Sequence, residues 1–192
     1  MKNDRFMPQT RSMHTEFRAA EEGQDKYIEG YFAIFGGVYE VFPGATESID
    51  PGAFDGELME DIRFLIDHET RLVLGRTKAK TGELRIDTHG LYGRVKINPS
   101  DQDAMNLYAR VERGDVDQCS FGFDILDEEI KNNPDGSIHW LIKKVKLWEV
   151  SVVTFPAYED TAVAARKKDF EQIQKRQMEV WRAKQKGRLG NA

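Results

Sequence analysis

Short apolar stretches separated by glycine, proline and polar residues run through most of the chain, and they predict a mainly β fold. The stretches are rich in aromatic and β-branched residues, as strands are. Turns are predicted between them, near Thr81-Gly82 and His89-Gly90, and Pro156 ends the last stretch. The predicted strands lie at residues 27–35, 61–67, 71–97 (two or three strands), 116–126, 138–143 and 145–155.

A helix is predicted after residue 100, where a capping motif precedes apolar residues at helical spacing. Ser100 and Asp103 fit a capping box. Gly114 is expected to end the helix, because glycine readily adopts the left-handed conformation found there. The apolar residues that share one face are Ala104, Tyr108 and Val111.

The C-terminal segment from Glu159 onward is charged and helical in pattern. Phe170, Ile173 and Trp181 could form a sparse apolar stripe along it. Two interpretations stay open for this segment. It is either a helix on the surface in solvent or a segment that docks on a partner.

The pattern as a whole predicts an α+β fold that is mainly β, with a charged helical C-terminal tail. Short strands joined by hairpins favour an antiparallel barrel or sandwich. Residues 1–14 are polar and are expected to form a loose arm. We therefore divide the chain into an N-terminal arm and lead-in (1–26), a main domain (27–165) and a helical tail (166–192).

Charge and composition exclude several functions. The net charge of −5 gives no general attraction to nucleic acid or to an anionic membrane. Cys119 is the only cysteine, so no internal disulfide forms, which fits a reducing compartment. No apolar run approaches the roughly 20 residues of a membrane span, and the N-terminus lacks the apolar core of a signal peptide. The chain is expected in the cytosol.

Ser120 lies in a stretch, DQCSFGFDI, that otherwise reads as a buried strand. Side chains alternate across a strand, so Cys119 and Phe121 face the core and Cys119 is expected to pack as a small apolar group. Ser120 then points the opposite way, beside Gly122, which would leave open space next to its hydroxyl. It is either an inert small residue or a nucleophile, and a nucleophilic serine needs a base and an orienting acid.

His68 is the strongest candidate for that base. It ends an apolar strand, on the same face as Phe64 and Ile66, at the mouth of a loop. The simpler interpretation is a polar residue that closes a strand. The other histidines are His14 in the predicted arm, His89 in a predicted turn and His139 in a predicted strand.

Glu149 is the candidate acid. Regular alternation in the strand at 145–155 places it among apolar residues, where an unpaired carboxylate would be costly. A partner is therefore implied, and the ring N–H of a histidine suits it. The alternative is an edge strand on which Glu149 faces water. The residues predicted to share its face are Val145, Leu147, Ser151 and Val153.

A metal site is poorly supported. The segment HETRL has Leu72 where the zinc motif H-E-x-x-H needs its second histidine. Asp67, His68 and Glu69 could bind a cation, but their spacing is not specific. A glycine-rich phosphate loop is absent from the sequence, and no metal or cofactor is expected.

Five segments resemble, in the same order, the prohead proteases of tailed bacteriophages, which are serine proteases that mature capsids. The resemblance covers roughly residues 27–165 and implies a fold like that of herpesvirus assemblin, a largely antiparallel β-barrel flanked by helices. The segments are IEGYFAIFG, ESIDPGAFDG, FLIDHETRLVLGRT, GDVDQCSFGF and WEVSVVTFPAYEDT.

The same resemblance implies roles for three residues. The family's nucleophile falls on Ser120, its base on His68, and its acid most naturally on Glu149. Herpesvirus relatives use a second histidine as the third member, so His139 and His89 stay as alternatives to Glu149.

The function implied is that of a serine endopeptidase inside the procapsid, in the cytoplasm of a bacterial host. Its substrates would be the major capsid protein, scaffolding protein and the protease itself. A homodimer stays open, and the charged tail is expected to contact scaffold and then be removed by self-cleavage. Two alternatives remain, a non-catalytic procapsid assembly protein and a serine esterase. Against the esterase, the G-x-S-x-G elbow is absent.

Overall fold

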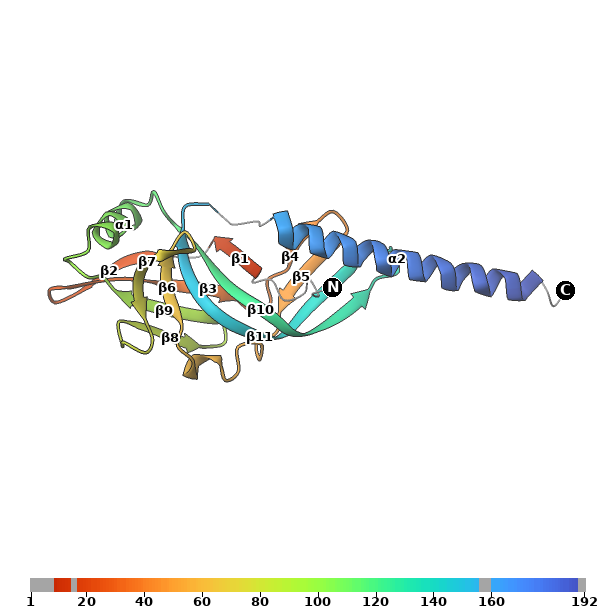
Figure 1. Cartoon of the computed structure of the whole chain (residues 1–192), viewed down its shortest axis with the longest axis horizontal. Coiled ribbons are helices and arrows are strands. Elements are labelled where there is room, and N and C mark those ends of the chain that lie inside the picture. The colour runs from red at the N-terminus through yellow and green to blue at the C-terminus, as the bar shows by residue number, and fades with distance from the viewer. Residues whose placement is uncertain (1–8, 15–16, 156–159, 190–192) are drawn as a thin grey trace.

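The computed structural model of the chain describes residues 9–14, 17–155 and 160–189. As the apolar pattern predicts, the described chain is mainly β, with two α-helices (Figure 1). The elements are β1 (Gln9–His14), β2 (Arg18–Glu22), β3 (Asp25–Ile34), β4 (Tyr39–Phe42), β5 (Ala45–Ile49), the 3-10 helix η2 (Glu57–Met59), β6 (Arg63–Ile66), β7 (Glu69–Arg76), β8 (Gly82–Ile86), β9 (Gly90–Lys96), α1 (Gln102–Arg113), β10 (Gln118–Asn132), β11 (Ile138–Val153) and α2 (Asp160–Leu189).

Within the described residues the strands form two open sheets, which corrects the predicted antiparallel barrel. One sheet has seven strands in the order β1-β10-β11-β5-β4, with β6 between β11 and β7, and the other has the order β2-β3-β9-β8. The strands β5 and β6 pair in parallel with the same edge of β11, one along each half of it. The two strands thus lie one after the other along this edge of β11 and extend the sheet. Hairpin signals in the sequence predict antiparallel neighbours, so they do not reveal this parallel pairing.

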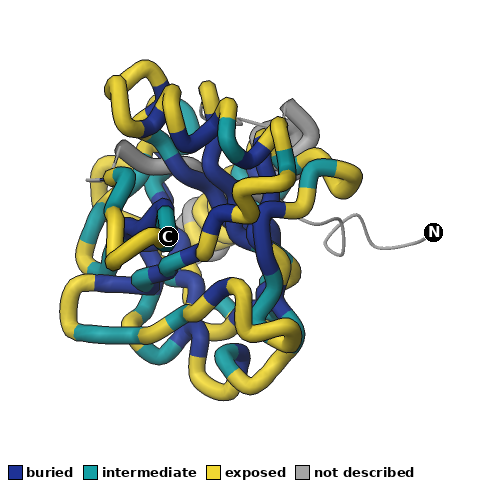
Figure 2. The backbone as a smooth tube through the Cα atoms, turned by 90° about the vertical axis from the view of Figure 1, so that its left-hand side faces the viewer, coloured by how far each residue is buried: buried dark blue, intermediate teal, exposed yellow. Residues whose placement is uncertain are grey.

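The two sheets share one apolar core. Figure 2 shows its buried residues in dark blue near the centre of the molecule, with exposed segments in yellow around them. Phe32 of β3 meets Phe64 of β6 edge to face, with ring centroids 5.8 Å apart. On β10, Cys119, Phe121 and Phe123 are fully buried, as the alternation predicts. Truncating a buried phenylalanine to alanine typically costs about 3–5 kcal/mol, so this face of β10 is a main source of stability.

Two segments differ from the predicted strands. Residues 9–14 were expected in a loose arm, but they form β1, which pairs antiparallel with β10 so that Ser12 lies opposite Ser120. A polar edge strand has no apolar alternation to signal it. The strands predicted at 138–143 and 145–155 are one continuous strand, β11. Residues 1–8 of the predicted arm lie outside the described residues.

Helix α1 is capped differently from the prediction. Its N-cap is Asp101, whose carboxylate accepts hydrogen bonds from the backbone N–H groups of Asp103 (3.0 Å) and Ala104 (3.3 Å). The capping box starting at Ser100 is therefore wrong by one residue, because an aspartate caps as well as a serine. Gly114 ends the helix with a φ of +83°, as predicted.

Helix α2 docks on the body through a buried arginine. Arg166 donates to Glu47 (2.8 Å) and Glu128 (2.7 Å) and stacks over the ring of Trp140, 4.7 Å from its centroid. Glu47 is fully buried, and removing one partner of such a buried ion pair is strongly destabilising. The ion pairs fix the N-terminal part of α2 on β5 and β10, and the stacking contact with Trp140 adds β11.

The apolar stripe predicted along this helix is correct for two of its three residues. Phe170 and Ile173 pack against the cluster around Trp140, whereas Trp181 is 57% exposed. Beyond the docked part, α2 runs on past the ends of the sheets (Figure 1). Neither of the two helices described is apolar and long enough to cross a membrane.

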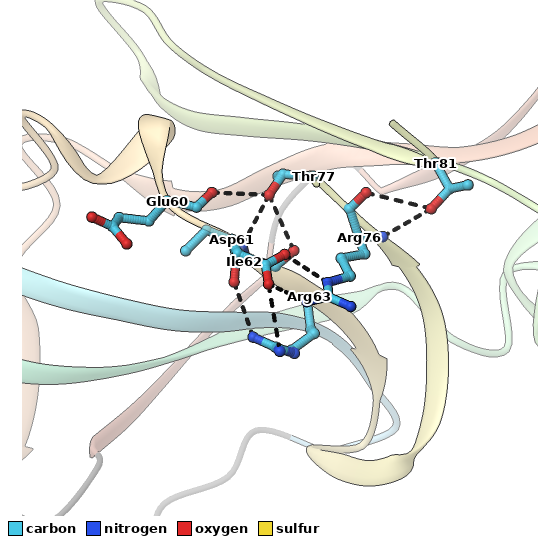
Figure 3. A network of polar contacts seen from close by, with 7 residues as sticks. All are labelled: Glu60, Asp61, Ile62, Arg63, Arg76, Thr77 and Thr81. Atoms are coloured by element: carbon cyan, nitrogen blue, oxygen red, sulfur yellow. Dashed lines mark hydrogen bonds and ion pairs between the residues drawn. The ribbon is translucent and has the colours of Figure 1, made fainter. Parts of the chain in front are cut away.

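An arginine–aspartate clamp closes the open end of the β6–β7 hairpin (Figure 3). Arg76 of β7 donates through Nε to Asp61 Oδ1 (2.7 Å) and through Nη2 to the second carboxylate oxygen. The Thr77 hydroxyl accepts from the Ile62 N–H (2.9 Å) and donates to the Glu60 carbonyl (3.0 Å). These bonds fix the register of the hairpin whose opposite end carries His68.

Replacing Asp61 with asparagine is expected to destabilise the fold at pH 7 and to weaken its acid sensitivity. The hydrogen bonds from Arg76 lower the pKa of Asp61 from 3.8 to about 2. A lowered pKa contributes stability above the unfolded value, and this contribution is lost as pH falls from about 4 toward 2. The free energy of unfolding in urea should therefore differ between wild type and Asp61→Asn by more at pH 7 than at pH 3. The exposed Asp117→Asn should show no such difference, and an equal gap at both pH values would contradict the prediction.

Candidate active site

His68 lies in a two-residue turn between β6 and β7. Ile66 pairs directly with Glu69, and the two residues between them, Asp67 and His68, have φ values of +48° and +60°. Positive φ at both central residues is what a type I′ hairpin turn requires. The turn takes His68 off the strand alternation, so the predicted common face with Phe64 and Ile66 is wrong.

The turn is held against the end of β11. The Asp67 N–H donates to the carbonyl of Val152 (3.0 Å). Its carboxylate accepts from the N–H of Thr154 (2.7 Å) and from the Thr154 hydroxyl (3.3 Å). Non-glycine residues with positive φ persist where their surroundings fix them, and these contacts do so for the turn that carries His68.

A β-bulge in β11 sets the direction of Glu149. In the register with β10, Glu149 lies opposite Gly122 while Leu147 lies opposite Phe123, so Trp148 is one residue too many. The extra residue moves Glu149 to the face opposite the buried Leu147. The prediction that Glu149 shares a face with Val145 and Leu147 is therefore wrong, because regular alternation cannot anticipate a bulge.

His68 and Glu149 form a hydrogen-bonded pair, which supplies the partner that the carboxylate was expected to need. His68 Nδ1 lies 2.7 Å from Glu149 Oε1, and the two side chains are 21% and 13% exposed. The second carboxylate oxygen accepts from the Ser151 hydroxyl (2.5 Å). His68 Nε2 is buried and has no hydrogen-bond partner in the part of the chain that the structure describes.

Ser120 lies on the same sheet face as this pair, directly opposite Ser151 in the register of β10 and β11. The prediction that it points away from the apolar face of β10 is confirmed. The open space expected beside it is not there, because Ser120 is fully buried and the Glu149 carboxylate lies over Gly122.

Gly122→Ala is expected to displace the carboxylate and to disable the site. A Cβ on Gly122 would lie 2.3 Å from Glu149 Oε1, far inside contact distance, so the His68–Glu149 bond could not keep its geometry. A misplaced catalytic group can cost roughly a hundredfold in rate. We would measure labelling of Ser120 by a fluorophosphonate, with Gly37→Ala as control, since a Cβ there comes no closer than 3.5 Å to its neighbours. Wild-type labelling of the Gly122 variant would contradict this account.

The other three histidines contact residues other than Glu149. Both ring nitrogens of His139 are engaged, by Thr46 (2.9 Å) and Ser48 (2.8 Å). The ring of His89 packs edge-on against Tyr31, with centroids 4.5 Å apart. His14 pairs with Gln118 in the sheet register. Glu149 contacts His68 rather than His139 or His89.

Cys119 is part of the core, and the described residues hold no cluster that fits a metal ion. Cys119 is fully buried and its thiol donates to the Tyr31 carbonyl (2.8 Å). Among residues 9–14, 17–155 and 160–189, no group of three histidine, cysteine or acidic side chains is arranged to hold a metal ion.

Sequence reasoning missed two residues that shape the site, Ser151 and Thr154. Ser151 bonds the Glu149 carboxylate, and Thr154 holds the turn through Asp67. A signal for Ser151 was present, because residues two apart on a strand share a face, so a serine two positions after an acid is placed to donate to it.

A histidine that bonds a carboxylate through Nδ1 is how serine hydrolases orient their base, and Ser120 lies on the same sheet face without a hydrogen bond to His68 Nε2. The family model of the caudovirus prohead serine protease matches residues 13–176, and the chain belongs to this family. It is 31% identical over 157 residues to the prohead protease of Enterobacteria phage HK97, covering 80% of this chain and 65% of that protein. The chain thus spans just under two thirds of that relative. No solved structure is significantly similar to it.

Proposed function

We propose that this chain is a serine endopeptidase that matures the phage procapsid. The observation that carries the proposal is the His68–Glu149 pair, with its unpartnered Nε2, on the sheet face that also bears Ser120. Membership of the prohead serine protease family supports the same reaction class.

In this mechanism Ser120 Oγ attacks the scissile carbonyl carbon while His68 Nε2 takes the hydroxyl proton. The protonated imidazole then gives that proton to the leaving amine, which leaves an acyl-enzyme. Water attacks the ester with His68 again as base, and the acid product departs. Glu149 keeps the Nδ1–H tautomer and stabilises the imidazolium through its 2.7 Å contact.

Access to the nucleophile requires a rearrangement. Ser120 has no exposed surface and His68 Nε2 is buried, so a peptide carbonyl reaches them only after the groups that cover them separate. A protease that acts only inside an assembled shell benefits from such a resting state, because it spares other proteins in the host cytoplasm.

The proposed substrates are scaffolding protein, or a scaffold-like N-terminal segment of the major capsid protein, and the protease itself. The HK97 relative is named a prohead protease, which supports action during capsid assembly. The fold resemblance to herpesvirus assemblin, the homodimer and contact of the charged tail with scaffold belong to the same proposal. A non-catalytic assembly protein is the competing function.

Co-expression with the major capsid protein of the same genome tests this function. Intact-protein mass spectrometry should find defined truncations with the wild type and none with Ser120→Ala. Truncations that persist with Ser120→Ala would refute Ser120 as the nucleophile. If the wild type gives no truncation in complete procapsids and Ser120 takes up no fluorophosphonate there, the chain is an assembly protein.

Glu149→Gln is expected to retain more activity than variants of Ser120 or His68, yet to fall well below wild type. The amide would present an N–H to Nδ1 or favour the wrong tautomer, and loss of the orienting acid costs roughly ten- to a hundredfold less than loss of the other members. The rate of fluorophosphonate labelling measures this, with the exposed Glu129→Gln as control. Full activity of Glu149→Gln would remove it from the triad.

A further inference from the structure

Ser151 joins the two halves of the candidate acid–base pair. Its hydroxyl donates to Glu149 Oε2 (2.5 Å) and accepts the backbone N–H of His68 (3.3 Å). The residue is fully buried. One hydroxyl therefore contacts both the acid and the backbone of the residue that carries the base.

These contacts separate Ser151 from the nucleophile. Its proton is directed at the Glu149 carboxylate and a lone pair is taken by the His68 backbone N–H. Neither contact involves the imidazole ring, which is the group that would have to remove the proton. Ser151 therefore holds other residues of the site in place. We assign the attack on the scissile carbonyl to Ser120, which lies opposite it.

We propose that Ser151 is a positioning residue that orients the Glu149 carboxylate toward His68; the proposal rests on the proposed function above. The terminal torsion of a glutamate is broad and lacks a strongly preferred value. A donor on Oε2 selects the orientation in which Oε1 faces Nδ1. The same hydroxyl accepts a hydrogen bond from the backbone of the strained turn, so it fixes the position of Glu149 relative to His68.

The first test compares labelling of Ser120 by a fluorophosphonate in the full chain within complete procapsids, and it separates the maximal rate from the half-saturating concentration. Ser151→Ala should lower the maximal rate roughly ten- to a hundredfold, as expected for a misoriented catalytic group, and leave the half-saturating concentration unchanged. Ser151→Thr, which keeps the hydroxyl, should recover most of the rate. Ser48→Ala is the matched control, since Ser48 is a buried serine of the same sheet that contacts His139 (2.8 Å).

The second test reads the His68–Glu149 bond directly. A proton shared between an imidazole Nδ1 and a carboxylate gives a far-downfield proton NMR signal, which would be assigned by its loss in His68→Gln. Ser151→Ala should move this signal upfield or abolish it, and Ser48→Ala should not. A merely structural role would lower the unfolding temperature without changing this signal in the folded protein.

The outcomes separate the two proposals. Wild-type labelling and an unchanged NMR signal in Ser151→Ala would overturn the positioning role. Absence of labelling in the wild type within procapsids would overturn the proposed function, while the NMR signal would still decide whether Ser151 orients Glu149. If Ser151→Ala fails to fold, Ser151→Cys, with a weaker donor of similar size, must show the same two losses, and wild-type values there would overturn the proposal.

Discussion

Ser120→Ala is expected to lower cleavage about a thousandfold or more while the protein stays folded. Without the hydroxyl no acyl-enzyme can form, and what remains is the small rate that binding and polarisation alone provide. The change removes one atom from a fully buried position on β10, so the stability cost should stay near 1 kcal/mol. A full loss of rate with a small loss of stability separates a chemical role from a packing role.

Fluorophosphonate titration of complete procapsids followed by peptide mapping would test this expectation, with circular dichroism melts of the purified protein to verify the fold. The wild type should carry the adduct on Ser120 and on no other serine. Ser48→Ala, another buried serine in the same sheet, should keep the adduct. An adduct on Ser151 instead would reassign the nucleophile, and an unfolded Ser120→Ala would show that the hydroxyl is needed for packing.

The regular part of the fold could be predicted because it follows periodicity. Alternation along β10 identified the buried face of Cys119, Phe121 and Phe123 and the opposite direction of Ser120. Helical spacing and a terminal glycine located α1 to within a few residues. In each case the direction of a side chain follows from its position in a regular strand or helix, and the local sequence pattern is enough to predict it.

The candidate site could not be predicted in this way, because the proposed base and the proposed acid both lie at irregularities of their strands. His68 leaves its strand in a type I′ turn without glycine, and Glu149 changes face at the bulge of Trp148. Extrapolated alternation places each of them toward the core, and the two errors are independent. Their pairing was reached through the cost of burying a carboxylate and through family resemblance, not through geometry.

The order of the strands in the larger sheet could not be predicted from the sequence pattern either. Pairing of β5 and β6 with one edge of β11 depends on which distant segments meet, and turn residues report only on adjacent strands. The same limit applies to β1, a polar segment recognised as a strand only through its register with β10. An open sheet in place of a barrel follows from these nonlocal pairings.

His68→Ala is expected to lower fluorophosphonate labelling and cleavage about as far as Ser120→Ala does, because the hydroxyl is a poor nucleophile without a base. Members of one catalytic unit are strongly non-additive. The double variant Ser120→Ala with His68→Ala should therefore cleave no more slowly than either single variant. Loss of the His68 ring leaves Glu149 Oε1 unpaired but partly exposed, so unfolding should become easier by only about 1–3 kcal/mol.

His139→Ala is the control that separates chemistry from stability. This ring is bonded at both nitrogens, to Thr46 and Ser48, so its removal should lower the melting temperature and leave the labelling rate of the folded fraction unchanged. His68→Ala should do the reverse, with a modest melting shift and loss of labelling. The opposite pattern, labelling that survives without His68 and disappears without His139, would move the base to the other histidine and leave the His68–Glu149 pair as a structural contact of the β6–β7 turn.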